Sequence, residues 1–400
     1  MRNKALKYGL IGFGIILLML LIFLAVRVIG FYNAIHTDSQ GTENSNQEVK
    51  EKMDYTVLIL GYGGGTHDGA NLTDTIMVAN INLEKKHVVL VSIPRDVWVN
   101  VPTKSSPFHS KINSIYQMAL FPKNYPDVDS SYYSDKNPSG LIKKVIFDIT
   151  GMKIDAYVSV DFQGFIKAIN TLGGIDVQVQ KTFTDYEYPL EGKETDLCER
   201  DEEFKAIEPI LNNEMSPEDQ TKLFEEKPEL KTFFTDIEDN PPIAFPCRYE
   251  ELHFEQGIAK MDGITALKYA RSRHALEDGG DFNRAKRQQN VLEAVKSKVL
   301  GIGFIPKIIP LLSDLENHVN TDLPLTEINK LLLEAPNADR YTVETLVLTD
   351  EFLTDGYSDY GGYIVYPKEG IDDWDRVKIA VQMMTGNITP TPSISVPIMQ

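Results

Sequence analysis

Five basic residues lie close together in the stretch Tyr269–Asn290, "YARSRHALEDGGDFNRAKRQQN", of a 400-residue chain whose formal net charge is -18. Guanidinium groups bind phosphate through two parallel hydrogen bonds, and several that converge suit a pyrophosphate. The alternative is that these arginines pair with nearby carboxylates, among them Glu277, Asp278 and Asp281. A nucleic-acid partner is not expected, because such binding needs a broad basic face and this chain is acidic.

Two predicted elements place these basic residues. The run "ALKYARSRH" is interpreted as a strand, in which Arg271 and Arg273 point to the same face of a sheet. The run "FNRAKRQQNVLEAVKSKVL" has helical spacing, and Arg287 lies beside a stripe formed by Arg284, Gln288, Val291, Val295 and Val299. Because a helix N-terminus also attracts anions, the polar start of this stripe is predicted to bind phosphate.

A second group of polar residues lies in "LGYGGGTHDGANLTDTIMVAN". Its glycines permit close approach of a ligand to the backbone, although their spacing matches no nucleotide-binding motif. Asp74, with Asp68 upstream, could hold Mg²⁺, which prefers one or two carboxylates together with phosphate oxygens and water. The alternative is that Asp74 only caps a turn. Arg95 and Asp96 follow another apolar strand, at the kind of position where α/β sheets gather ligand groups.

The elements between these motifs predict an α/β fold. The runs "YTVLILGYG", "DTIMVANINL", "HVVLVSIPRDVWV" and "YVSVDF" are rich in β-branched residues, and "SGLIKKVIFDIT" and "GFIKAINTLG" have helical character. Near-continuous apolar strands beside helices indicate a sheet covered on both faces. We therefore expect a three-layer α-β-α domain around a mostly covered, mixed central sheet.

One transmembrane helix is predicted before this domain. The segment Tyr8–Val26 carries no charge and has about the length that spans a bilayer core. Arg2, Lys4 and Lys7 precede it, so the positive-inside rule places the N-terminus in the cytoplasm and the rest of the chain outside. The alternative is a cleaved signal peptide. The predicted organisation is an anchor at 1–30, a polar linker at 31–53, a main domain outside the membrane at 54–345 and a C-terminal extension at 346–400.

An acidic insertion interrupts the predicted domain. From about Thr182 to Gln256 the chain has about 22 carboxylates against about seven Lys and Arg residues. It also contains both cysteines, Cys198 and Cys247. They could form a disulfide that closes a loop of about 48 residues and contributes about 4 kcal/mol, or remain two free thiols.

The ordered motifs "DTIMV", "VSIPRDVWVNVP", "KINSIY", "VDFQGFIKAINTLGGIDVQV", "YARSRH" and "GDFNRAKRQQNVL" resemble the LytR-CpsA-Psr family over roughly Tyr55 to Val299. This resemblance implies a domain held outside the bacterial membrane by an N-terminal helix. It also implies a phosphotransferase that moves a glycopolymer, such as teichoic acid or capsule, from a polyprenyl-pyrophosphate carrier to a peptidoglycan sugar hydroxyl.

The resemblance also implies roles for individual residues. Residues expected to bind the pyrophosphate are Arg95, Arg271, Arg273, Arg284, Arg287 and Gln288. Asp74 matches a carboxylate that coordinates Mg²⁺ or Mn²⁺ and could assist deprotonation of the attacking hydroxyl. Asp281 and Lys111 match supporting positions. An apolar groove for the lipid tail is expected between sheet and helix, with "LIKKVIFDI" and "VLEAVKSKVL" as candidates for its walls.

The sequence departs from the family pattern at the predicted metal site. Leu72 stands where the family has an arginine, and the first family aspartate is replaced by "YGGGTHDG", so that Asp68 or His67 could substitute for it. Two other functions therefore stay open, a polyprenyl-pyrophosphate hydrolase and a regulator that binds lipid or glycan without catalysis.

Overall fold

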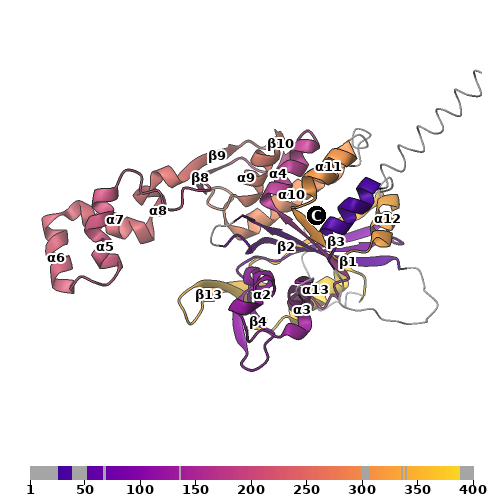
Figure 1. The fold of residues 1–400 in the computed structure, drawn as a ribbon, viewed down its shortest axis with the longest axis horizontal. Coiled ribbons are helices and arrows are strands. Elements are labelled where there is room, and N and C mark those ends of the chain that lie inside the picture. Colours follow the sequence, from indigo (N-terminus) through magenta and orange to yellow (C-terminus); the bar gives the residue numbers. More distant parts are fainter. Residues whose placement is uncertain are drawn as a thin grey trace, which may run out of the picture. The chain divides into compact units, whose positions relative to one another are not determined.

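A computed structural model describes residues 26–37, 52–65, 69–134, 137–299, 307–334, 337 and 340–387. Within it the chain divides into two compact units. The first unit comprises Met1–Val177, Lys260–Ala270 and Ala285–Gln400, and the second unit comprises Gln178–Ala259 and Arg271–Arg284. Figure 1 shows the elements of each.

A six-stranded sheet in the order β11-β6-β1-β2-β3-β12 forms the centre of the first unit. Its strands are β1 (Asp54–Tyr62), β2 (Thr73–Asn82), β3 (His87–Ser92), β6 (Ala156–Asp161), β11 (Val319–Thr321) and β12 (Thr342–Val347). The pairs β1/β6 and β3/β12 are parallel, and the other neighbours are antiparallel. The predicted mixed sheet is therefore confirmed, and four of its strands coincide with the β-branched runs noted above.

Helices cover both faces of this sheet (Figure 1). One face carries α2 (Ile115–Leu120), α3 (Ser139–Thr150) and α13 (Asp375–Met384). The other carries α4 (Phe162–Thr171), α10 (Gly280–Val299), α11 (Ile308–Leu315) and α12 (Leu325–Glu334). The three-layer α-β-α arrangement expected from the sequence is thus present.

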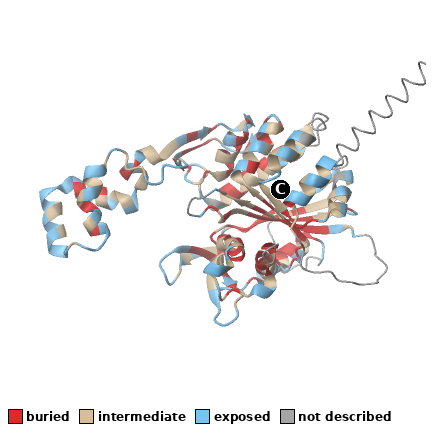
Figure 2. Cartoon of the chain, viewed as in Figure 1, coloured by how far each residue is buried: buried red, intermediate tan, exposed pale blue. Residues whose placement is uncertain are grey.

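Alternation along the strands assigns side chains to the two faces. The side chains on one face pack with α2, α3 and α13 in the main core, and they include Leu58, Leu60, Ile76, Val78, Val89 and Val91. The side chains on the other face point toward α10 and α12, and they include Ala79, Ile81, Val88 and Leu90. Figure 2 shows buried residues concentrated along these strands. This division follows from the two-residue period of a strand.

The described part of the chain also contains a helix over residues 26–35 and several shorter elements. The strands are β4 (Trp98–Val101), β5 (Phe108–Lys111), β7 (Ile175–Val179), β10 (Gly257–Met261), β13 (Leu353–Tyr357) and β14 (Tyr363–Pro367). The 3₁₀ turns are η1 (Ile112–Ser114), η2 (Pro122–Asn124), η3 (Ser130–Tyr132) and η4 (Pro246–Arg248).

The prediction of a strand over "ALKYARSRH" was wrong, because this run forms helix α9 (Gly263–Arg271). Asp262 Oδ1 accepts a hydrogen bond from Thr265 N at 2.8 Å and so satisfies a free N–H group at the start of the helix. The buried residues Ala266, Tyr269 and Ala270 recur at helical spacing. Arg271 therefore ends a helix, and Arg273 lies in the segment that follows.

Among the residues that the structure describes, no helix combines the length and apolar composition needed to cross a membrane. The predicted span Tyr8–Val26 lies outside those residues, apart from Val26.

The second unit contains most of the acidic segment. This segment forms a β-hairpin, and the connection between its two strands contains helices. Its elements are β8 (Phe183–Pro189), α5 (Asp201–Leu211), α6 (Pro217–Glu226), α7 (Pro228–Asp239), α8 (Pro241–Ala244) and β9 (Tyr249–Phe254). Strands β8 and β9 pair antiparallel. The helices enclose a small core of their own, formed by Ile207, Ile210, Leu230, Phe233, Ala244 and Phe245.

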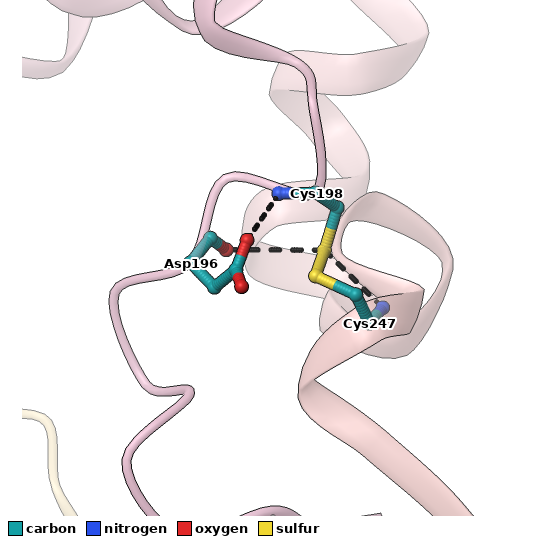
Figure 3. Close-up of side chains that lie close together, drawn as sticks. All are labelled: Asp196, Cys198 and Cys247. Atoms are coloured by element: carbon teal, nitrogen blue, oxygen red, sulfur yellow. Dashed lines mark hydrogen bonds between the residues drawn. A yellow bond between two sulfur atoms is a disulfide. The ribbon is translucent and has the colours of Figure 1, made fainter.

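A disulfide between Cys198 and Cys247 closes the helical part of this unit, with their Cα atoms 5.5 Å apart (Figure 3). Asp196 lies beside it, and its Oδ1 accepts a hydrogen bond from Cys198 N at 2.9 Å. The sulfur atoms are bonded to each other and are not thiolates, so this group is a structural link and not a metal site. The question left open by the sequence is answered in favour of the disulfide.

Replacing both cysteines with serine should destabilise the helical segment. For the sequence separation of 49 residues, the chain-entropy model gives a loss of about 4 kcal/mol. Limited proteolysis should then cut between Cys198 and Cys247 far faster than in the parent protein, and reduction of the parent should have the same effect. Equal cleavage rates in the serine variant and the oxidised parent would contradict this prediction.

Candidate active site

An ion pair between Asp74 and Arg95 lies where β2 begins and β3 has just ended. Arg95 Nη1 donates a hydrogen bond to Asp74 Oδ1 at 2.5 Å. The side chain of Arg95 is 26% exposed and that of Asp74 is 22% exposed, so the pair is accessible to a ligand without being fully solvated. The structure therefore brings together two residues that the sequence predicted to share one site.

Hydrogen bonds to the backbone of Asn113 hold the two residues in this position. The buried Thr73 hydroxyl donates to the carbonyl oxygen of Asn113 at 3.2 Å. Asn113 N donates in turn to the carbonyl oxygen of Arg95 at 3.2 Å. Both links run through Asn113, which ties the start of β2 to the segment after β3. Such support keeps a binding group in a fixed geometry.

Asp96, which the sequence placed beside Arg95 without assigning it a role, supports the site from within the protein. It is only 4% exposed, and its carboxylate accepts hydrogen bonds from Lys111 Nζ at 2.6 Å and Arg95 Nε at 3.4 Å. A buried carboxylate is costly unless it is paired. Lys111, predicted as a supporting residue, thus pairs with Asp96, and Asp96 helps to orient Arg95.

Asp74 offers a limited donor set for a metal ion. One of its oxygens is bonded to Arg95, which leaves Oδ2 as a further acceptor. Among the described residues, the only group of at least three His, Cys, Asp or Glu side chains near enough to share a metal is that of Asp196 and the disulfide. One carboxylate fits Mg²⁺ where substrate phosphate and water complete the coordination. Asp68 and His67, the other candidates, lie outside the described residues.

Helix α10 presents two buried arginines. Arg284 and Arg287 are 5% and 2% exposed, and Val291 and Ala294 continue the same buried stripe. The helix therefore has the predicted stripe that is polar at its start and apolar further on. The buried stripe runs through Arg287 and Ala294, however, and not through Gln288 and Val295 as predicted.

Other predicted residues of α10 have different surroundings. Gln288 is half-buried, and its neighbour Gln289 donates to the Ser92 hydroxyl at 3.0 Å. Asp281 belongs to α10, but its side chain lies outside what the structure describes.

Arg271 and Arg273 do not share a strand face, which corrects the sequence prediction. Both belong to the second unit. Arg271, at the end of α9, donates from Nη1 to the Tyr188 hydroxyl at 3.4 Å. Arg273 lies in an irregular segment after α9. In this segment Gly279 packs against the backbone of Ala275 so closely that a Cβ atom would lie 2.3 Å from the Ala275 carbonyl oxygen.

Asp185 organises this segment, a role that its place in the sequence did not predict. It is 0% exposed, and its Oδ2 accepts from Ser272 Oγ at 2.6 Å, Arg273 N at 3.1 Å and His274 N at 3.2 Å. A buried carboxylate with several donors fixes the local backbone. Asp185 therefore positions the residues on either side of Ser272. The segment around it holds many carboxylates, and no signal in the sequence distinguishes this one.

An apolar cavity of about 600 Å³ lies between the sheet and α10 in the first unit. Its apolar wall includes Ala79, Ile81, Leu83, Val88, Leu90, Leu292, Leu331 and Val343. One of the two predicted groove segments, "VLEAVKSKVL", contributes to this wall. The other, "LIKKVIFDI", belongs to α3 and packs in the core on the opposite face.

The sequence profile described as the LytR_cpsA_psr family matches residues 23–373. The chain belongs to the LytR-CpsA-Psr family. The resemblance noticed in the sequence is thereby confirmed over most of the chain.

Individual relatives of the LytR-CpsA-Psr family agree with this assignment. An Enterococcus faecalis protein named polyisoprenyl-teichoic acid–peptidoglycan teichoic acid transferase TagU is 22% identical over 368 residues, which are 89% of this chain and 92% of that protein. The crystal structure of B. subtilis TagV has a TM-score of 0.50 at 22% identity and covers 85% of this chain and 100% of that one. A structure of TagT bound to LI-WTA has a TM-score of 0.50 at 19% identity and covers 88% and 100%. At these identities the solved structures show a shared fold.

Exchange of the predicted pyrophosphate ligands Arg271 and Arg273 for lysine, one at a time, should lower transfer activity by about tenfold, or about 1.4 kcal/mol in transition-state binding. Lysine keeps the charge but lacks the planar fork that binds two phosphate oxygens. Steady-state kinetics should be measured beside a thermal melt, which should stay unchanged. Near-parental turnover in both variants would show that these arginines only pair with carboxylates.

Proposed function

We propose that this protein is a membrane-anchored phosphotransferase that moves a glycopolymer from a polyprenyl-pyrophosphate carrier to a sugar hydroxyl of peptidoglycan. The observation that carries this proposal is the position of the Asp74–Arg95 pair relative to the cavity. Arg95 follows β3 by three residues, and Ser92 at the end of β3 bonds to Gln289, which lines the cavity. A phosphate-binding group beside an apolar cavity suits a ligand with a charged head and a hydrocarbon tail.

The relatives support the chemical class of substrate. The name of the Enterococcus faecalis protein specifies transfer of teichoic acid from a polyisoprenyl carrier to peptidoglycan. The related TagT structure is described as bound to LI-WTA. Membership of the same family and an intact Asp74–Arg95 pair favour a similar reaction here, with the glycopolymer itself unspecified.

In the proposed reaction the acceptor hydroxyl attacks the phosphorus nearest the glycan. A bond forms between the hydroxyl oxygen and phosphorus, and the bond from phosphorus to the bridging oxygen breaks. The electron pair leaves with the bridging oxygen, so that polyprenyl monophosphate is released. The hydroxyl proton passes to a base, for which the Asp74 carboxylate is the proposed acceptor.

The residues of the site would act mainly through charge and position, which dominate catalysis of phosphoryl transfer. Arg95 binds pyrophosphate oxygens, and Asp96 holds the guanidinium in place from behind. Arg271, Arg273, Arg284, Arg287 and Gln288 are proposed as further phosphate ligands. Asp74 would hold Mg²⁺ or Mn²⁺, which when bound would neutralise charge on the phosphates.

The proposed location is the outer side of the bacterial cell membrane. The segment Tyr8–Val26 would anchor the chain with its N-terminus in the cytoplasm, as the flanking charges predict. The glycan on its carrier lipid, the peptidoglycan and the folded domain would then all lie on the outer side of the membrane. The disulfide suits an oxidising compartment outside the cytoplasm.

Product analysis tests this proposal. The purified protein is incubated with Mg²⁺ and a polyprenyl-pyrophosphoryl oligosaccharide, with and without peptidoglycan, and the products are identified by mass spectrometry. A transferase gives peptidoglycan that carries glycan phosphate. Free glycan phosphate in the absence of peptidoglycan would instead identify a hydrolase, and binding without turnover would identify a regulator.

A further inference from the structure

The hairpin formed by β13 and β14 carries three exposed tyrosines near its turn. The exposed fraction is 76% for Tyr357, 93% for Tyr360 and 43% for Tyr363. Tyr357 and Tyr363 lie opposite each other in the strand register, and their ring centres are 6.5 Å apart at an interplanar angle of 82°. Exposed apolar side chains that gather in one place, unlike single ones, mark interaction sites. We call these three tyrosines the aromatic tip.

Core packing does not explain the aromatic tip. Side chains two or four residues apart along a strand share a face, so Leu353 shares the face of Tyr357, and Val365 shares that of Tyr363. Leu353 and Val365 are buried in the main core of the first unit. The face that anchors the hairpin in the core therefore continues outward to the two tyrosines, which the protein leaves exposed.

The turn of the hairpin has a defined conformation. Ser358 N donates to the carbonyl oxygen of Gly362 at 2.9 Å, and Gly361 N donates to the carbonyl oxygen of Ser358 at 2.8 Å. Gly361 has a φ of 78°, which suits glycine. A turn held in this way presents its side chains in a fixed arrangement, and such an arrangement lowers the entropy lost when a ligand binds.

The hairpin starts beside the candidate active site. Val365 N donates to the carbonyl oxygen of Asp96 at 3.0 Å, and the Asp96 carboxylate bonds to Arg95. Tyr363 precedes Val365 by two residues, which span about 7 Å in a strand. In Figure 1 the hairpin, labelled at β13, extends beyond α2. The aromatic tip is therefore tied through a short segment to the residues proposed to hold the reacting phosphate.

The charge of the hairpin indicates what kind of molecule it binds. Residues 353–367 include two carboxylates, those of the exposed Asp355 and Asp359, and no basic residue. A contact with an anionic membrane surface would need lysine or arginine, and a polyanion such as teichoic acid would be repelled. A sugar chain with an uncharged backbone meets no such repulsion. The C–H groups of a pyranose ring pack on the negative face of an aromatic ring, and carboxylates accept hydrogen bonds from sugar hydroxyls.

We propose that the aromatic tip binds the glycan backbone of the peptidoglycan acceptor and directs one of its hydroxyls toward the phosphate at Arg95. The inference rests on the proposed function for the identity of the acceptor. Because the rings of Tyr357 and Tyr363 are nearly perpendicular, one ring stacks on a sugar while the other borders that sugar at its side. Tyr360, at the turn, contacts a further sugar of the same strand.

Binding to peptidoglycan tests this inference without any turnover. The full-length protein in detergent is sedimented with purified peptidoglycan from which attached polymers have been removed. Tyr357→Ala and Tyr363→Ala should each raise the dissociation constant by about fivefold, as expected for loss of one aromatic contact, and the double variant by about twentyfold. Tyr357→Phe and Tyr363→Phe keep the ring and should stay within about twofold of the parent. In transfer assays the alanine variants should raise KM for peptidoglycan while kcat stays within about twofold.

Matched controls separate stacking on sugars from other effects. Phe147→Ala removes an aromatic side chain of α3 in the same unit that is 46% exposed, similar to Tyr363, and should leave the dissociation constant unchanged. A soluble β-1,4-linked N-acetylglucosamine oligomer should displace the parent protein from peptidoglycan, whereas soluble teichoic acid should not.

Three results would overturn the inference. The first is parental affinity for peptidoglycan in the double alanine variant with an unchanged melting curve. The second is displacement by teichoic acid but not by the sugar oligomer, which would assign the aromatic tip to the donor polymer. The third is a loss of binding that accompanies a change from dimer to monomer on gel filtration, which would assign it to a second copy of the chain. Peptidoglycan binding that responds as predicted without any glycan transfer would overturn the proposed function alone.

Discussion

Replacement of Arg95 with glutamine is expected to lower kcat/KM for glycan transfer by about a hundredfold or more, the usual cost of removing one donor that stabilises transition-state charge. Glutamine has a similar length but neither charge nor fork. The change removes the hydrogen-bond partner of Asp74 and one of two cations beside Asp96. Steady-state rates with a soluble polyprenyl-pyrophosphoryl oligosaccharide provide the measurement.

A control variant shows whether the loss reflects the site. Arg376→Gln removes a guanidinium from the same unit that is 43% exposed and pairs with Glu351 and Glu369. It should change kcat/KM by less than about twofold, as expected for exposed pairs. If Arg95→Gln also stays within about threefold of the parent while the melting curves agree, Arg95 does not bind the reacting phosphates.

Replacement of Asp74 with asparagine is expected to lower kcat by about a hundredfold and to abolish the dependence on Mg²⁺. Asparagine keeps an oxygen that can accept from Arg95, so the local geometry should survive. It loses the negative charge that a hard cation requires. Activity should be titrated with Mg²⁺ at constant ionic strength in the variant and the parent.

The control for this prediction is Asp148→Asn on α3, which removes an exposed carboxylate far along the chain and should leave the Mg²⁺ titration unchanged. Retention of both the rate and the Mg²⁺ response in Asp74→Asn would remove Asp74 from the metal site. Another carboxylate, such as that of Asp68, would then have to supply this function.

Much of the fold could be predicted because the strands of the central sheet are recognisable from their local sequence. The runs that form β1, β2 and β6 are continuous apolar segments, and α3 begins and ends at the predicted residues. The failure at α9 has a clear physical cause. The alternation of Arg271 and Arg273 resembles a strand, but the preceding alanine, leucine and lysine residues favour a helix, and Tyr269 packs in the core from that helix.

The candidate site was only partly predictable, because tertiary contacts determine it. Asp74 and Arg95 were found from motifs, whereas the burial of Asp96 and Asp185 depends on segments that meet only in the folded chain. The two predicted groove segments are both amphipathic. Amphipathicity shows that a helix packs against the sheet but not on which face, so the sequence could not assign the cavity to α10 rather than α3.

The release of polyprenyl monophosphate, measured as a function of peptidoglycan concentration, tests the transferase assignment most directly. For a transferase we expect release that is close to zero without peptidoglycan, rises to saturation as acceptor is added, and matches the glycan phosphate joined to peptidoglycan one for one. Release at a constant rate whatever the acceptor concentration, with water in place of the sugar hydroxyl, would contradict it.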